Sequence, residues 1–98
     1  MSNIKKLNFL KYDINDGGDA MVDSQYKMNL IKIGLKIAYY RKLQGMTQEE
    51  LAEACDLSSG YVSQLEAPNC FFCPSLKTLF KIAEVLSTTV SKLTDIED

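Results

Sequence analysis

Residues 47–66 (TQEELAEACDLSSGYVSQLE) constrain the fold more than any other part of the chain. Thr47 and Glu50 have the spacing of a capping box, in which each side chain accepts a hydrogen bond from the other residue's backbone N–H. Ser58 is a second N-cap candidate. Asp56 lies between the two helix starts, where a tight turn requires a positive φ that Asp tolerates better than most residues. The segment therefore predicts two short helices joined by a tight turn.

The apolar residues of this segment have the spacing that two crossed helices need. Counted from Gln48, the fifth residue is the small Ala52, where the helices approach closely, and the fifteenth is the β-branched Val62, which packs against the first helix. The remaining core positions are predicted to be Leu51, Cys55, Leu57 and Leu65. A helix–turn–helix of this shape can place its second helix in the major groove of DNA.

The segments on either side of 47–66 are also predicted to be helical. Spacings of three and four place one apolar stripe on a helix over about residues 25–44, and Gly45 suits its left-handed end. Ser75 is predicted to cap a fourth helix, and Thr88 or Thr89 a short fifth. The predicted apolar faces are Leu30, Ile33, Ile37, Tyr40 and Leu43 on the first helix, Leu76, Leu79, Phe80, Ala83 and Leu86 on the fourth, and Val90, Leu93 and Ile96 on the fifth. We expect the last three residues either to complete the core or to form a dimer interface.

The predicted fold class is therefore all-α, a compact bundle of five helices. Residues 26–98 are expected to form this domain, and residues 1–25, which lack sustained helical periodicity, a flexible or loosely docked N-terminal arm. A chain of 98 residues with 46% apolar composition is enough for one such core. No apolar run reaches the length of a membrane span and no leader is evident, so we expect no membrane association and a cytoplasmic protein.

The charge balance argues against strong binding of nucleic acid. The net charge is −2, whereas phosphate neutralisation supplies most non-specific affinity for DNA. The distribution is more favourable, because the residues between Leu30 and Gln48 include four cations and no acid: Lys32, Lys36, Arg41 and Lys42. We expect a locally basic face with a weak field.

Two longer stretches, IGLKIAYYRKLQGMTQEELAEACDLSSGYVSQLE and PSLKTLFKIAEVLSTTVSKL, resemble the phage-repressor and Cro-like (Xre) family of DNA-binding proteins. The resemblance covers about Leu30 to Leu93, and TQEELA, YVSQLE and PSL…L.KIA..L are specific to the family. It implies a lambda-repressor-like bundle whose third helix recognises DNA. It also implies a transcriptional regulator, usually a repressor, that binds operator DNA as a dimer on an inverted repeat.

The resemblance also assigns roles to individual residues. Gln48 would contact phosphate or order the recognition helix, and Gln64 could read adenine through its amide. Arg41 and Glu66 match a pair that in the family joins the first helix to the end of the third. The full set of DNA-binding candidates is Gln48, Ser58, Ser59, Gly60, Tyr61, Ser63 and Gln64.

Two departures from the family leave an alternative open. The loop 67–74 carries no cation, and Gly60 weakens the recognition helix without offering a side chain. The alternative is a protein-interaction module, such as an antitoxin-like partner, that uses this loop and its adjacent Phe71 and Phe72.

Catalysis and metal binding find little support in the sequence. The chain has no His and no Gly-rich phosphate loop, so we expect neither enzymatic activity nor a cofactor. Cys70 and Cys73 form a single CxxC, which as a zinc site would take Cys55 as third ligand and an acid as fourth. Plain thiols are the simpler interpretation, and no metal site is predicted.

Overall fold

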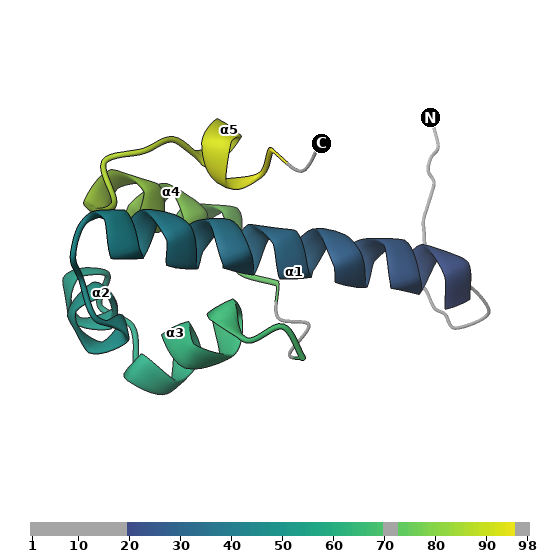
Figure 1. The fold of residues 1–98 in the computed structure, drawn as a ribbon, viewed down its shortest axis with the longest axis horizontal. Helices are drawn as coiled ribbons and strands as arrows, with labels where there is room; N and C mark the ends of the chain where they lie inside the picture. The colour runs from purple at the N-terminus through teal and green to yellow at the C-terminus, as the bar shows by residue number, and fades with distance from the viewer. Residues whose placement is uncertain (1–19, 70–72, 96–98) are drawn as a thin grey trace, which may run out of the picture.

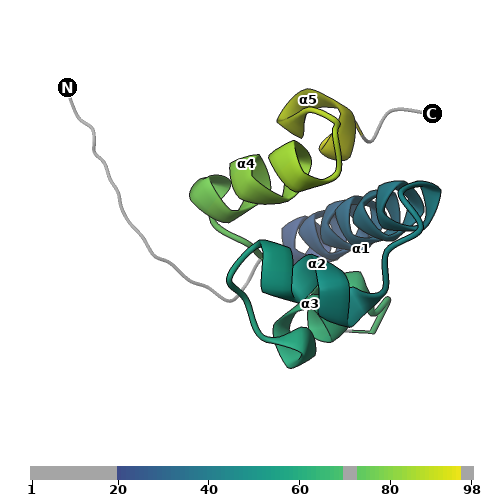
Figure 2. The ribbon, with the colours of Figure 1, turned by 90° about the vertical axis from the view of Figure 1, so that its left-hand side faces the viewer.

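The computed structural model describes residues 20–69 and 73–95, with side chains from residue 24 onward. It contains five α-helices and, within these residues, no strand: α1 (Ala20–Leu43), α2 (Gln48–Ala54), α3 (Ser59–Glu66), α4 (Leu76–Val85) and α5 (Val90–Leu93). Helix α1 runs the length of the molecule, with α2 and α3 on one side of it and α4 and α5 on the other (Figures 1 and 2). The all-α prediction is confirmed.

The helix starts lie where the cap residues predicted them. Thr47 Oγ1 accepts a hydrogen bond from Glu50 N at 3.0 Å, and Glu50 Oε1 accepts one from Thr47 N at 2.9 Å, which completes the capping box. Ser58 and Ser75 cap α3 and α4 through the backbone N–H three residues on. Thr89, rather than Thr88, caps α5 in the same way. These caps satisfy backbone groups that each helix would otherwise leave without a partner.

Three helices end in a residue with positive φ. These residues are Gly45 after α1, Asp56 after α2 and Ser87 after α4, with φ of 70°, 59° and 57°. In each case the next residue donates its N–H to a carbonyl five residues back, the arrangement of a Schellman motif, at distances of 3.1, 2.8 and 2.9 Å. Gly45 and Asp56 were predicted to adopt this conformation, whereas Ser87 was not identified from the sequence.

The core lies between α1 and the other four helices. Its most buried large side chains are Ile37, Leu51, Val62, Ile82, Leu86 and Leu93. Leu93 is fully buried and Val90, which is half-buried, packs against the core, so these two residues of α5 complete the bundle. Ile96, the third residue predicted on that face, lies outside the described residues.

Three apolar residues assigned to the core from periodicity are exposed instead. Leu43 is 62% exposed, Leu76 61% and Phe80 59%. Periodicity predicted a broad apolar face on each helix, but the neighbouring helices cover only part of it. On α4 the buried positions are Leu79, Ile82 and Ala83, so the buried face is rotated from the predicted one.

Helix α1 begins earlier than expected. It starts at Ala20 rather than near Gln25, so the predicted boundary between arm and domain falls within this helix. The sequence from Ala20 to Gln25 contains neither Gly nor Pro and therefore permits the helix to extend. The rest of the predicted arm, residues 1–19, lies outside the described part of the chain. In the described part, no helix combines the length and the apolar character needed to cross a membrane.

Candidate nucleic-acid interface

Helix α3 has one buried face and one exposed face. Val62 is fully buried, and Leu65 and Glu66 are also buried, so this side holds the helix against α1 and α2. The exposed residues are Ser59, Gly60, Ser63 and Gln64, four of the predicted DNA-binding residues. They share one side of the helix because their spacings are one and four residues. The fold therefore presents these four residues together to solvent.

The other two α3 candidates have roles within the bundle. The Ser58 hydroxyl accepts a hydrogen bond from Tyr61 N at 3.0 Å and so caps the helix. Tyr61 is half-buried and packs against the core, at the border of the exposed face. Both residues therefore fix the start of α3, beside the exposed surface.

The predicted pair of Arg41 and Glu66 is present as a bidentate ion pair. Arg41 Nε donates to Glu66 Oε2 at 2.8 Å, and Arg41 Nη2 donates to Glu66 Oε1 at 2.9 Å. The third guanidinium nitrogen, Nη1, donates to the carbonyl oxygen of Met46 at 2.7 Å. Both residues are 8% exposed. The hydrogen bond with Glu66 raises the pKa of Arg41 more than burial lowers it, so the guanidinium stays charged.

Gln48 joins the same network. Its Nε2 donates to Glu66 Oε1 at 2.9 Å, across the crossing of α2 and α3. The sequence offered two roles for Gln48, contact with phosphate or ordering of the recognition helix. This hydrogen bond is the kind of contact that the ordering role needs, and contact with phosphate stays a prediction. The Glu66 carboxylate therefore receives hydrogen bonds from both α1 and α2, and the end of α3 is held from two sides.

Gly34 is a positioning residue that the sequence analysis did not identify. It lies on α1 where that helix crosses the end of α3, and a Cβ built on it would collide with the carbonyl oxygen of Leu65. Glycine is thus required for the close approach of the two backbones. In contrast, a Cβ on Gly60 would meet nothing within 4 Å, so Gly60 faces open space on the exposed side of α3. Only the surroundings of each glycine, and not the sequence around it, separate these two cases.

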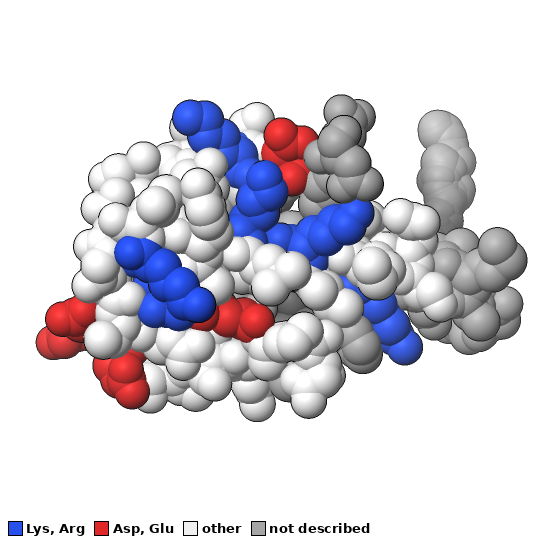
Figure 3. Space-filling view, viewed as in Figure 1, with Lys and Arg blue, Asp and Glu red and all other residues white. Residues whose placement is uncertain are grey.

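The exposed side of α3 carries no charge. The one carboxylate of helix α3, Glu66, lies on the buried side and is paired with Arg41. Acidic side chains are instead exposed on α2, at Glu49, Glu50 and Glu53. In Figure 3 the surface along the lower edge, where α3 runs, is largely uncharged, and the basic side chains lie mainly higher up, over α1 and the helices above it. The exposed face of α3 is therefore suited to reading hydrogen bonds, with little electrostatic attraction of its own.

The loop after α3 lies only partly within the described residues. Pro68, Asn69 and Cys73 are exposed, while Cys70, Phe71 and Phe72 lie outside the described part, so the proposed aromatic contact is not located. Cys55 is buried and Cys73 exposed. Within the described residues, no three His, Cys, Asp or Glu side chains gather as metal ligands.

Comparison with known proteins agrees with this geometry. The helix-turn-helix family model HTH_3 matches residues 37–93. The HTH-type transcriptional regulators SinR of Bacillus subtilis and Bacillus licheniformis are 38% and 36% identical over 63 and 66 residues, which is 64% and 67% of this chain and 56% and 59% of theirs. The chain thus matches somewhat more than half the length of these relatives. The uncharacterized HTH-type transcriptional regulator MJ0272 of Methanocaldococcus jannaschii is 35% identical over 63 residues, which is 64% of this chain and 92% of that protein.

A solved structure provides the corresponding comparison of folds. The crystal structure of SinR, the master regulator for biofilm formation, in complex with DNA matches with a TM-score of 0.60 and 38% identity. The match covers 64% of this chain and 98% of that one. Taken with the capped helices α2 and α3 and the turn at Asp56, these matches show that the chain belongs to the helix-turn-helix family, in its phage-repressor (Xre) type.

Proposed function

We propose that this protein is a sequence-specific DNA-binding regulator of transcription that inserts α3 into the major groove. The observation that carries the proposal is the exposed face of α3, where Ser59, Ser63 and Gln64 project from a helix that is anchored on its other side. The likeness to the structure of SinR in complex with DNA supports DNA as the ligand.

The residues of this face suit the reading of base edges. The Gln64 amide both donates and accepts, and so matches N7 and N6 of adenine. Ser59 and Ser63 can donate or accept and therefore discriminate less between bases. Gly60, with open space around it, allows a close approach of the α3 backbone to DNA. We therefore assign most of the base discrimination to Gln64.

A second group of residues fixes the angle of α3. Arg41 and Gln48 both hydrogen-bond Glu66, and Gly34 sets the distance between α1 and the end of α3. We propose that these residues contribute to DNA affinity indirectly, by holding the recognition helix in place before binding. Preorganisation of this kind reduces the entropy that binding would otherwise cost.

We further propose that the protein acts as a dimer on an inverted repeat, as a repressor in the cytoplasm. Helix α3 has 8 residues. At a rise of about 1.5 Å per residue, such a helix is only about 12 Å long and reaches a few base pairs. Two copies related by a two-fold axis would double the site that is read. The alternative function, a protein-interaction module, rests on Phe71 and Phe72, which lie outside the described residues, and it remains a prediction.

Salt dependence of binding separates the two functions. A DNA site is first selected from a random pool with the full chain, and binding is then measured at increasing salt. With roughly four phosphate contacts, affinity is expected to fall about 100-fold between about 50 and 200 mM salt. A protein whose affinity for every duplex is weak, or does not change with salt, would contradict the proposal.

A further inference from the structure

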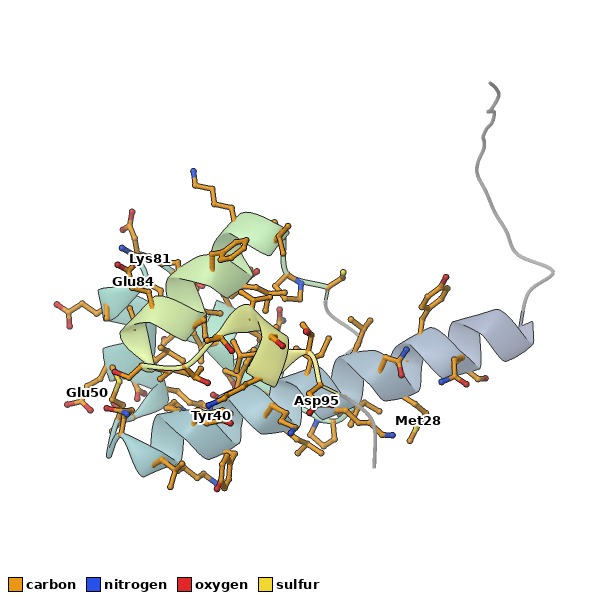
Figure 4. The ribbon with its side chains drawn as sticks, turned by 90° about the horizontal axis from the view of Figure 1, so that it is seen from above. Met28, Tyr40, Glu50, Lys81, Glu84 and Asp95 are labelled. Atoms are coloured by element: carbon orange, nitrogen blue, oxygen red, sulfur yellow. The ribbon has the colours of Figure 1, made fainter. Side chains whose placement is uncertain are left out.

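Helix α1 has apolar residues on two opposite sides. Its inner side supplies the core with Ile33, Ile37 and Tyr40. On its outer side, Met28, Leu35 and Tyr39 are exposed, at 51%, 53% and 57%. In Figure 4 the side chain of Met28 projects from the side of α1 that faces away from α4 and α5. The outer side of a helix that faces water usually carries polar residues. The exposed apolar residues on the outer side of α1 therefore indicate a surface that binds another molecule.

The outer stripe has the spacing of a helix-packing seam. Met28, Ile31, Leu35 and Ala38 follow one another at intervals of three, four and three residues, and Tyr39 lies beside them. Ile31 and Ala38 are half-buried and the other three exposed. Alternating intervals of three and four are those at which one helix receives the side chains of another. We call these five residues the outer stripe. Their spacing indicates that the outer stripe packs against another helix.

The charges beside the outer stripe identify the kind of helix. From Ser24 to Gln48 the chain contains no acid and five cations, Lys27, Lys32, Lys36, Arg41 and Lys42. Arg41 is buried against Glu66, whereas Lys42 is exposed beside the outer stripe. Two copies of α1 packed on each other would bring like charges together in either orientation, which destabilises a helix pair. An amphipathic helix with Glu or Asp beside its apolar side would meet opposite charges.

We propose that the outer stripe of α1 binds an acidic amphipathic helix of a partner protein. This site is separate from the exposed face of α3, since Leu35 faces solvent and Gly34 beside it faces α3. The proposal goes beyond DNA binding and does not depend on it. It gives the regulator a surface through which a second protein can act on it.

The test uses the full chain and a synthetic labelled peptide of about four heptads, with Leu at the a and d positions and Glu at e and g. A matched peptide carries Lys at e and g. The Glu peptide is expected to bind about tenfold more tightly than the Lys peptide by fluorescence anisotropy, because only the former complements the lysines of α1. Equal binding of the two peptides would overturn the proposal.

Variants of the chain locate the binding surface. Leu35→Ser is expected to weaken binding of the Glu peptide about tenfold or more, whereas Leu76→Ser, at a similarly exposed leucine on α4, leaves it unchanged. Lys42→Glu should also weaken binding, and Lys77→Glu on α4 should not. A Leu35→Ser variant that binds as well as the original chain would contradict the assignment. Size-exclusion chromatography with light scattering provides a second check. If the original chain is a dimer and the Leu35→Ser variant is a monomer, the outer stripe binds a second copy of this chain, and the proposal is contradicted.

Discussion

Arg41 and Glu66, 25 positions apart in the sequence, form a bidentate ion pair that joins the first helix to the last residue of the recognition helix. The guanidinium also holds the Met46 carbonyl, and the carboxylate also accepts from Gln48. Together, these hydrogen bonds connect four parts of the chain: α1, the turn before α2, α2 itself and α3. The pair therefore positions α3 as well as stabilising the fold.

Removing one partner of this pair is expected to be costly. Glu66→Leu leaves a buried guanidinium and Arg41→Met a buried carboxylate without its counter-charge, and we expect the free energy of unfolding of each single variant to fall by about 3–5 kcal/mol. The double variant Arg41→Met with Glu66→Leu removes both charges and should recover much of that loss. Urea unfolding of the single and double variants measures the difference. If the two single losses simply add in the double variant, the two side chains do not act as a pair.

The two helical glycines 34 and 60 are expected to respond oppositely to alanine. Gly34→Ala places a methyl group against the Leu65 carbonyl, and we expect a loss of about 1–3 kcal/mol in unfolding free energy. Gly60→Ala meets open space in the first turn of α3, and we expect a gain of less than about 1 kcal/mol, the value for a helix interior. Thermal or urea unfolding of the two variants decides the point. A Gly34→Ala protein as stable as the original would show that α1 and α3 do not approach so closely.

The buried thiol of Cys55 is expected to reduce stability at alkaline pH. Burial raises the pKa of Cys55 in the folded state, although nearby Lys81 lowers it in part. Above the unfolded value of about 8.5, the unfolded chain loses this proton while the folded chain keeps it, so unfolding becomes more favourable as pH rises. The protonated Cys55 thiol therefore contributes its full stabilisation below about pH 8.5, and this stabilisation is lost as the pH rises from there through the higher pKa of the folded state.

The control for this prediction is Cys55→Ala. Its unfolding free energy, measured by urea from about pH 7 to pH 10, should fall less steeply above about pH 8.5 than that of the original chain. All other titrating groups are common to the two proteins. Identical slopes would mean that the pKa of Cys55 is the same in the folded and unfolded states.

How far the sequence predicts this protein depends on whether a feature is local. The caps at Thr47, Ser58 and Ser75 and the turn at Asp56 are formed by residues within five positions of one another, and each was predicted. Leu76 and Phe80 were misassigned, because periodicity detects an apolar face but not which part of it the neighbouring helices cover.

The candidate DNA-binding site also combines features that could be predicted from the sequence with features that depend on how the helices pack. The DNA-binding candidates of α3 came from the resemblance to the phage-repressor family, and four of them, Ser59, Gly60, Ser63 and Gln64, lie on the exposed side of the helix. The hydrogen bond of Gln48 to Glu66 and the close approach at Gly34 join residues 18 or more positions apart. The resemblance implied an ordering role as one of two for Gln48 but did not name its partner, and nothing in the sequence near Gly34 predicts the close approach there. Both contacts follow only from the crossing of the helices.

The central claim is that α3 reads DNA through Gln64, and base preference at a selected site tests it most directly. In the Gln64→Ala variant, discrimination at one base pair of each half-site should fall by about 1–3 kcal/mol while the others keep theirs. Gln48→Ala should instead weaken binding to all sites by a similar factor, because it acts through the position of α3. A Gln64→Ala protein with the affinity and base preference of the original chain would contradict the account.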